Sequence, residues 1–234
     1  MAEPYPIFEL KTDRPALIEQ LGSKPKFWFR LADDEQPWLF KFAREGTGKH
    51  WAKKIAAELA VKIELPAARV ELAEFTGKRG LASRSFVRRM EGFDLVHGDE
   101  LLAGHVIGYD RTKVFRQSSH SISNIVQAIG AVFPEAGARD AQLTRFARLM
   151  VLDALIGNTD RHHQNWGILR RVRPNGGIEH EVAPSFDHAS ALGRNVPAEE
   201  GVERVPDGWM DGSQKKFCLT LLDSTCSELK KLPL

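Results

Sequence analysis

Hydrophobic and polar positions along the chain predict a β-rich first part followed by a mainly helical part. Aromatic-rich runs at residues 27–31 and 38–42 flank a polar turn and predict two strands. Residues 67–75 and 80–88 predict two more strands around a short turn. Before them, residues 14–21 carry apolar side chains at helical spacing, so a short helix is expected there.

Three longer segments have the periodicity of amphipathic helices. They cover residues 50–62, 123–133 and 141–156, and Ser123 is expected to cap the second. The buried stripe of the first helix is predicted to consist of small and large apolar residues, namely Trp51, Ala52, Ile55, Ala56 and Leu59. The third helix leads directly into the most polar motif of the chain.

That motif is NTDRHHQNWG at residues 158–167, and SFDHAS follows at 185–190. Between them, two short strands around a Pro-Asn-Gly-Gly turn predict a hairpin, which would return Asp187 to the vicinity of Asn165. Asp160, Asn165 and Asp187 are thus oxygen-rich side chains bounded by apolar runs. The layout predicts a site for a metal ion and a nucleotide.

The chemistry of phosphoryl transfer gives these residues roles. Mg²⁺ takes a few carboxylate or amide oxygens together with substrate phosphates. A kinase catalytic loop supplies an Asp that orients the acceptor hydroxyl, an Asn five positions later that binds metal, and a later metal-binding Asp. Asp160, Asn165 and Asp187 have this order and spacing. Asp160 is therefore the predicted catalytic residue, and Asn165 and Asp187 are the predicted metal ligands.

The order Asp-Arg-His within LIGNTDRHHQN, with the later SFD, resembles the HipA-like kinases over about residues 22–192. Lipid kinases of the phosphatidylinositol class share a similar Asp-Arg-His loop. The resemblance implies an α+β, bilobal protein-kinase-like fold with a β-rich N-lobe at 1–90 and a mainly helical C-lobe at 91–234. It also implies ATP and Mg²⁺ as cofactors and a protein Ser or Thr hydroxyl as acceptor.

Phosphate-binding residues are expected in the first part of the chain. Lys41 lies between two phenylalanines of a predicted strand, and a kinase needs a strand lysine to bind the inner phosphates of the nucleotide. The alternative is that Lys41 lies on the solvent-exposed face of an edge strand. By resemblance, the segment GSKPK at 22–26 is the phosphate-covering loop, with Gly22, Ser23 and Lys26 binding the nucleotide and Ser23 a point of autophosphorylation.

The helix at residues 50–62 departs from the kinase pattern. A glutamate on this helix normally pairs with the strand lysine, yet Lys49, Lys53 and Lys54 occupy the expected position. Either Glu58 or Glu45 substitutes, or the pair is missing. A missing pair would favour a catalytically impaired nucleotide-binding module over an active enzyme. A kinase acting on a lipid or small molecule is a further alternative, because of the shared loop.

Histidines raise a rival hypothesis, a metallohydrolase. His162, His163, His180 and His188 lie near acidic residues, but their spacings match no common zinc motif. We expect His162 to brace the loop by hydrogen bonds and His163 to be exposed. Asp153, on the preceding helix, is expected to be an ordinary helix-face carboxylate.

Composition restricts the partners and the compartment. Net charge is +2, from 33 basic and 31 acidic residues, which gives no reason to expect direct binding to nucleic acid. The two cysteines suit a reducing compartment, and neither a membrane span nor a signal peptide is indicated, so a cytoplasmic protein is expected. By resemblance, an antitoxin is a possible partner, as in a toxin-antitoxin system. Two short helices are expected in the tail after residue 212.

Overall fold

The structure is a computed structural model that describes residues 3–11, 17–19, 26–44, 48–114, 116–188, 191, 205, 208, 212, 215, 216 and 220. Two compact units emerge from its packing. The first contains Met1–Phe86, Leu152–Thr159 and Asp187–Leu234, and the second contains Val87–Val151 and Asp160–Phe186. The predicted lobe boundary near residue 90 stays a prediction. Each unit is described below by itself.

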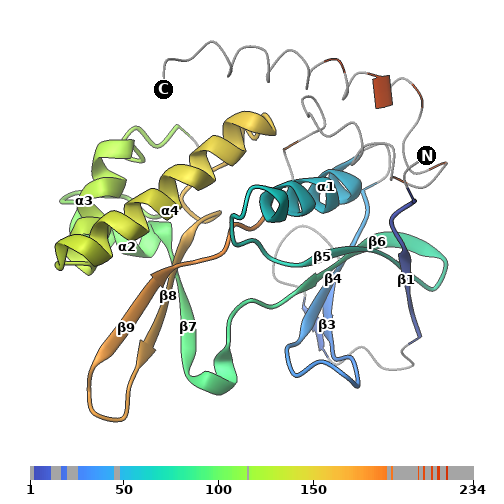
Figure 1. The fold of residues 1–234 in the computed structure, drawn as a ribbon, viewed down its shortest axis with the longest axis horizontal. Helices are drawn as coiled ribbons and strands as arrows, with labels where there is room; N and C mark the ends of the chain where they lie inside the picture. The colour runs from blue at the N-terminus through green and yellow to red at the C-terminus, as the bar shows by residue number, and fades with distance from the viewer. Residues whose placement is uncertain are drawn as a thin grey trace. The chain divides into compact units, whose positions relative to one another are not determined.

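A mixed six-stranded sheet forms the first unit (Figure 1). Its strands, in spatial order, are β1 (Ile7–Leu10), β5 (Val70–Phe75), β6 (Lys78–Arg84), β4 (Trp38–Phe42), β3 (Lys26–Phe29) and β2 (Leu17–Glu19). β1 pairs with β5 in parallel, and the remaining pairs are antiparallel. The two aromatic strands of the sequence are therefore neighbours, as predicted.

Aromatic side chains fill the core on one face of this sheet. Phe40 is fully buried, and its ring centroid lies 5.1 Å from that of Phe27. Burial of each such side chain is worth roughly 1.5–3 kcal/mol relative to exposure. Because side chains alternate along a strand, burying Trp38 and Phe40 on this face directs Lys41 to the opposite face.

Helix α1 (Lys49–Lys62) packs against β5 and β6. The predicted stripe of Trp51, Ala52, Ile55, Ala56 and Leu59 is buried, so that prediction is confirmed. The helix follows Gly48, where an added Cβ would lie 1.9 Å from Cζ2 of Trp51. Glycine at this position lets the indole ring close the start of the helix.

The prediction of a helix at residues 14–21 is wrong for the part that the structure describes. Leu17–Glu19 form β2, with Leu17 opposite Trp28 and Ile18 opposite Phe27. Backbone hydrogen bonds to an existing strand outweigh a weak helical spacing over so few residues. β1 was not predicted either, because a four-residue strand carries almost no periodic signal.

The second unit combines a three-stranded antiparallel sheet with helices (Figure 1). Its elements are η1 (Arg89–Glu91), β7 (Phe93–His97), α2 (Gly98–His105), α3 (Ile122–Val132), α4 (Ala136–Leu155), β8 (Gly167–Val172) and β9 (Ile178–Val182). The last four residues of α4 belong to the first unit. The predicted hairpin and both long helices are confirmed, although Ser121, and not Ser123, caps α3.

An apolar cluster fills much of the core in the described part of the second unit. Its members include fully or almost fully buried residues, among them Leu102, Ile129, Phe146, Trp166 and Ile168. Trp166 packs edge-on against Phe146, with centroids 5.1 Å apart. Trp166, near the end of the polar motif, is therefore anchored in the core of this unit.

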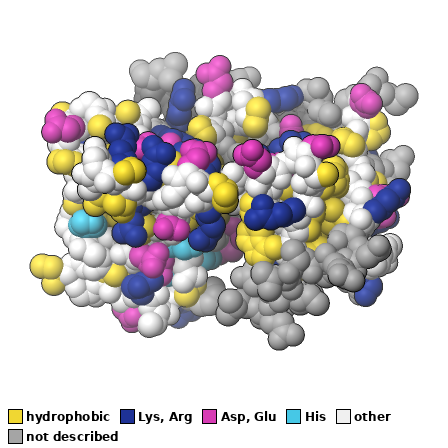
Figure 2. All heavy atoms as spheres, turned by 90° about the horizontal axis from the view of Figure 1, so that it is seen from below, with side chains coloured by type: hydrophobic (Ala, Val, Ile, Leu, Met, Phe, Trp, Pro, Cys, Tyr) yellow, Lys and Arg dark blue, Asp and Glu magenta, His cyan; other side chains and the backbone are white. Residues whose placement is uncertain are grey.

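At the surface, charges of both signs are interspersed. Figure 2 shows Lys and Arg side chains lying next to Asp and Glu side chains over the described part of one face, as the small net charge implies. Among the described helices, none is both long and apolar enough to cross a membrane.

Candidate active site

Asp187 is the centre of a cluster of charges in the first unit. Lys53 Nζ lies 2.7 Å from Asp187 Oδ1, and Lys41 Nζ lies 3.6 Å from Asp187 Oδ2. Lys53 belongs to helix α1, and Lys41 belongs to strand β4. Each carboxylate oxygen thus faces a different ammonium group.

The position of Lys41 in the sheet excludes the edge-strand alternative. β4 lies between β3 and β6, so it is an interior strand. Lys26 of β3 is directly opposite Lys41 in the antiparallel register. Two lysines at opposed positions repel each other, so such a pair is tolerated best where anions are near. The register also places Glu19 of β2 opposite Lys26, and Asp187 contacts Lys41, so each lysine has an acidic residue of the chain near it.

Asp187 is unusual both in its charged surroundings and in its backbone geometry. Burial disfavours the ionised form, but the ammonium groups of Lys53 and Lys41 outweigh burial and hold the pKa of this carboxyl well below its usual range. Its backbone has a φ of 52°, in the left-handed region that few residues other than glycine adopt. Strained backbone of this kind concentrates at functional sites.

Glu58 does not pair with the strand lysine. It accepts from Lys54 at 2.6 Å, and Lys54 also donates to Glu71 of β5 at 2.8 Å. Among the described residues, the acidic partner of Lys41 is Asp187. The alternative in which Glu58 substitutes for the helix glutamate is therefore not supported, because Glu58 pairs with the side chain of Lys54, only 6% of which is exposed. Glu45 lies outside the described residues.

The predicted phosphate-covering loop is described only at its end. Gly22 and Ser23 lie outside the described residues, so their nucleotide-binding roles stay predictions. Lys26 begins β3 and is half-buried.

Asp160 and Asn165 belong to a tightly bonded loop of the second unit, between α4 and β8. The side-chain Nδ2 of Asn165 donates to the carbonyl of Asp160 at 2.7 Å. This bond fixes which way the amide points and leaves its Oδ1 as the atom that can bind a cation. Arg161 donates to the carbonyls of Asn165 and Phe186, the latter at 3.0 Å. Phe186 immediately precedes Asp187 in the chain.

The backbone at the junction of β7 and α2 forms hydrogen bonds to the same loop. Backbone amides of Gly98 and Asp99 donate to the carbonyls of Trp166 and His163, each at 2.9 Å. A Cβ on Gly98 would lie 2.3 Å from the Trp166 ring and 2.6 Å from the His163 carbonyl oxygen. Glycine is thus required for this close approach. The sequence motif gave no sign of this support, because residues 95–114 have a mixed polar pattern.

His163 is part of this support and is not exposed, contrary to expectation. It is 1% exposed, and its Nδ1 lies 2.7 Å from the hydroxyl of Tyr109. His120 accepts from the indole Nε1 of Trp166 at 3.1 Å. Burial lowers the pKa of His163 and lowers that of His120 to about 4. Both imidazoles are therefore neutral at pH 7.

His162 braces the loop as predicted, since its Nδ1 accepts from the backbone amide of Gln164 at 3.2 Å. Within the described part of the chain, no group of three or more His, Cys, Asp or Glu side chains could hold a metal ion. The metallohydrolase hypothesis therefore has no support from these histidines.

Asp153 is buried, which a surface carboxylate on a helix would not be. It is 7% exposed and accepts from Asn158 Nδ2 at 2.7 Å, within the first unit. This bond ties the end of α4 to the start of the polar motif.

The donor atoms fit magnesium chemically. Carboxylate oxygens of Asp187 and the amide Oδ1 of Asn165 are hard ligands of the kind that Mg²⁺ prefers. The amide is already oriented by Asp160, and the carboxylate is ionised. Each residue therefore offers a ligand in the required protonation state.

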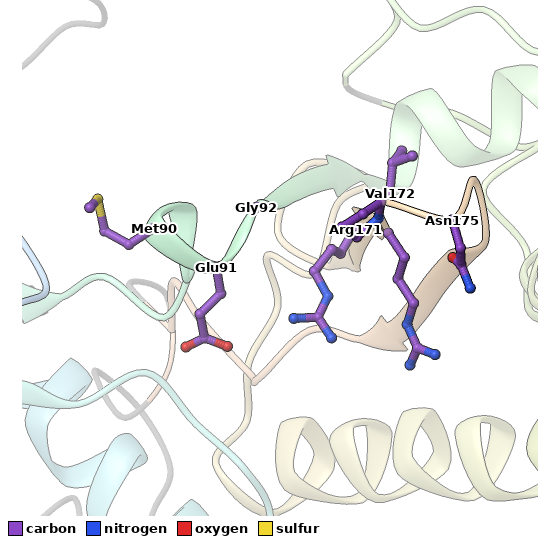
Figure 3. A pocket seen from close by; sticks show the side chains of 8 residues that line it. Met90, Glu91, Gly92, Arg171, Val172 and Asn175 are labelled. Carbon is purple, nitrogen blue, oxygen red and sulfur yellow. The ribbon is translucent and has the colours of Figure 1, made fainter.

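One hollow of about 670 Å³ lies elsewhere, entirely within the second unit (Figure 3). Its lining comes from η1 and the glycine after it, the end of β8 and the β8–β9 turn, namely Met90, Glu91, Gly92, Arg171, Val172, Arg173, Pro174 and Asn175. Figure 3 shows the side chains of Glu91 and Val172 pointing in opposite directions. Arg171 and Arg173 are both held by Glu179, at 2.5 Å and 3.0 Å. None of the predicted site residues lines this hollow.

Comparisons with known proteins bear on the family and the fold of this chain. A stretch of 47 residues is 45% identical to the serine/threonine-protein kinase CtkA of Helicobacter pylori and covers 20% of this chain but only 14% of that protein. The crystal structure of the proinflammatory kinase CtkA of Helicobacter pylori is similar with a TM-score of 0.70 and 16% identity, over 95% of this chain and 94% of that one.

HipA of Shewanella oneidensis, in a complex with HipB and operator DNA, is similar with a TM-score of 0.51 and 15% identity, over 93% of this chain and 59% of that one. These two structures confirm the predicted α+β kinase-like fold. The family description that matches residues 19–220 is the HipA-like C-terminal domain. The chain therefore belongs to the HipA-like C-terminal domain family.

Proposed function

We propose that this chain is an ATP-dependent kinase that transfers the γ-phosphate to a Ser or Thr hydroxyl of a protein. The observation that carries the proposal is the contact of Lys41 with Asp187, residues far apart in the sequence and 3.6 Å apart in the first unit. A strand lysine that contacts the inner phosphates and a late aspartate that binds their metal ion are two charged groups of a kinase site.

The proposed roles follow from the chemistry of each side chain. Asp160 orients the acceptor hydroxyl and takes its proton. Asn165, through Oδ1, and Asp187 would hold Mg²⁺, which, when bound with ATP, neutralises the charge that develops on the transferred phosphoryl group. Lys41 would neutralise the inner phosphates, with Lys26, Gly22 and Ser23 at the covering loop. Positioning and electrostatics would supply most of the rate enhancement.

The acceptor is proposed from the comparisons, because the relative with the 47-residue match is a serine/threonine-protein kinase. An antitoxin-like protein partner is proposed on the likeness to HipA, whose structure contains HipB. A lipid or small-molecule acceptor is the competing possibility within the same reaction class.

One experiment tests the activity and the acceptor together. Purified protein is incubated with labelled ATP, Mg²⁺ and cell extract, and the label is followed into protein, lipid and small-metabolite fractions. We expect label in protein Ser or Thr, and none with Asp160→Ala. Label confined to lipids or metabolites would contradict the proposed acceptor, and equal transfer by Asp160→Ala would contradict the role of Asp160.

A second candidate function is a nucleotide-binding module without turnover. It is favoured by the pairing of Glu58 with Lys54, which leaves Lys41 without the helix glutamate partner of ordinary kinases. This candidate predicts that the wild-type protein binds ATP and transfers no label to any fraction.

A further inference from the structure

Lys53 stands where the kinase pattern leads one to expect an acidic side chain, and it contacts the predicted metal ligand more closely than Lys41 does. The two distances to Asp187 are 2.7 Å and 3.6 Å. Only 12% of the Lys53 side chain is exposed, against 31% for Lys41. Salt screens a half-buried contact of this kind less than it screens a surface ion pair.

The two ammonium groups and the one carboxylate of this contact have charges that sum to +1. A divalent cation approaching Asp187 alone must displace the Lys53 ammonium from Oδ1 and meets the repulsion of both lysines. The phosphates of a nucleotide change this balance, because they offer both ammonium groups other anionic partners. The carboxylate then becomes available at the moment when the phosphates themselves supply further metal ligands.

We infer that Lys53 is a positioning residue that keeps Asp187 from binding a divalent cation until a nucleotide draws its ammonium group away. This inference rests on the proposed function, since it assigns Asp187 to the metal. Its consequence is a coupling between the two ligands: nucleotide raises the affinity for metal, and metal raises the affinity for nucleotide by the same factor.

The test measures Mn²⁺ binding by electron paramagnetic resonance, with and without ADP, and needs no turnover. In Lys53→Met the charge is lost and the apolar stem is kept. We expect this variant to bind Mn²⁺ without nucleotide about tenfold more tightly than wild type, within the usual range of coupling between sites. The enhancement of Mn²⁺ affinity by ADP should shrink accordingly.

Three further variants make the result specific. Lys53→Arg keeps the charge and should behave as wild type. Lys62→Met removes an exposed lysine from the last turn of the same helix and should change nothing. Asp187→Asn should abolish the extra Mn²⁺ binding when it is combined with Lys53→Met. If Lys53→Met is poorly folded by circular dichroism, Lys53→Gln replaces it in the same series.

The outcomes separate this inference from the proposed function. Unchanged or weaker Mn²⁺ binding by Lys53→Met overturns the role of Lys53, even if the protein is an active kinase. Failure of the wild-type protein to bind any nucleotide contradicts the proposed function instead. In that case a tighter Mn²⁺ site in Lys53→Met would still support the contact of Lys53 with Asp187 as the obstacle to metal.

Discussion

The two units hold their predicted site residues in different ways. In the first unit, Asp187 is surrounded by the long side chains of Lys41 and Lys53, and ion pairs determine its state. In the second unit, Asp160 and Asn165 belong to a loop fixed by short hydrogen bonds and by buried rings behind it. Long charged side chains can exchange partners when a charged ligand arrives, whereas a loop bonded through its backbone is preorganised.

This contrast predicts which measured property a substitution in each unit should change. Changes around Asp187 should alter the affinity for metal and nucleotide, with a strong dependence on ligand charge. Changes at Asp160 and at the buried rings behind its loop should alter turnover and stability, whereas changes at Asn165, the proposed metal ligand of the same loop, should resemble changes at Asp187.

The largest expected effect compares Asp160→Ala with Asp187→Asn. Asp160→Ala lacks the proposed general base, so it should transfer phosphate about 10²–10⁴ times more slowly and bind nucleotide normally. Asp187→Asn should instead lose the Mg²⁺-dependent part of nucleotide binding. Labelled-ATP transfer and titration with a fluorescent nucleotide measure the two properties. If both variants showed the same loss of transfer and the same loss of Mg²⁺-dependent nucleotide binding, the different roles proposed for Asp160 and Asp187 would be contradicted.

Next in size is the contrast between the adjacent lysines of α1. Lys54→Met should lower the free energy of unfolding by about 3 kcal/mol, because it leaves Glu58 and Glu71 without the charge that they share. Urea denaturation at pH 7 measures the effect, and the exposed Lys62→Met should stay within about 0.5 kcal/mol of wild type. A loss below about 1 kcal/mol for Lys54→Met would assign no structural role to this network.

A smaller effect is expected from Gly98→Ala, which lies beside the loop that carries Asp160. The new Cβ would collide with Trp166 and the His163 carbonyl, at a cost of about 1–3 kcal/mol in stability and with a lower kcat. Nucleotide affinity measured without Mg²⁺ should not change. Gly104→Ala is the matched control in the same helix, since a Cβ there meets nothing within 4 Å. It should stabilise the protein by about 0.5–1 kcal/mol.

The smallest predicted effect concerns pH. The folded-state pKa of His120, about 4, is below its ordinary value of 6.5, so the unfolded chain binds the proton more readily. The stability contribution of neutral His120 is therefore complete above pH 6.5 and is lost as pH falls toward 4. His120→Gln keeps an acceptor for Trp166 and removes the titration.

Urea denaturation at several pH values tests this prediction. Between pH 6 and pH 5 the variant should lose less stability than wild type, by on the order of 1 kcal/mol. Burial also lowers the pKa of His50, in the first unit, to about 4. Both proteins should therefore keep the part of the pH dependence of stability that comes from His50. Parallel curves for variant and wild type would mean that His120 does not titrate in this window.

The sequence by itself determined which residue types take part and most of the regular elements. Phe40 and Trp38 define β4, the stripe of α1 is buried as its spacing requires, and the order of Asp160, Asn165 and Asp187 is a local pattern. Such features depend on side-chain chemistry and on the period of a helix or strand, which are properties of neighbouring residues.

Only the tertiary structure decided how partners are shared among these residues. Lys53 and Lys54 are adjacent and chemically identical, yet one contacts Asp187 and the other Glu58 and Glu71. His163 is buried against Tyr109, although its neighbours in the sequence are polar. Leu17–Glu19 became a strand because β3 offered it hydrogen bonds. Partners of this kind come from distant parts of the chain, so no local pattern specifies them.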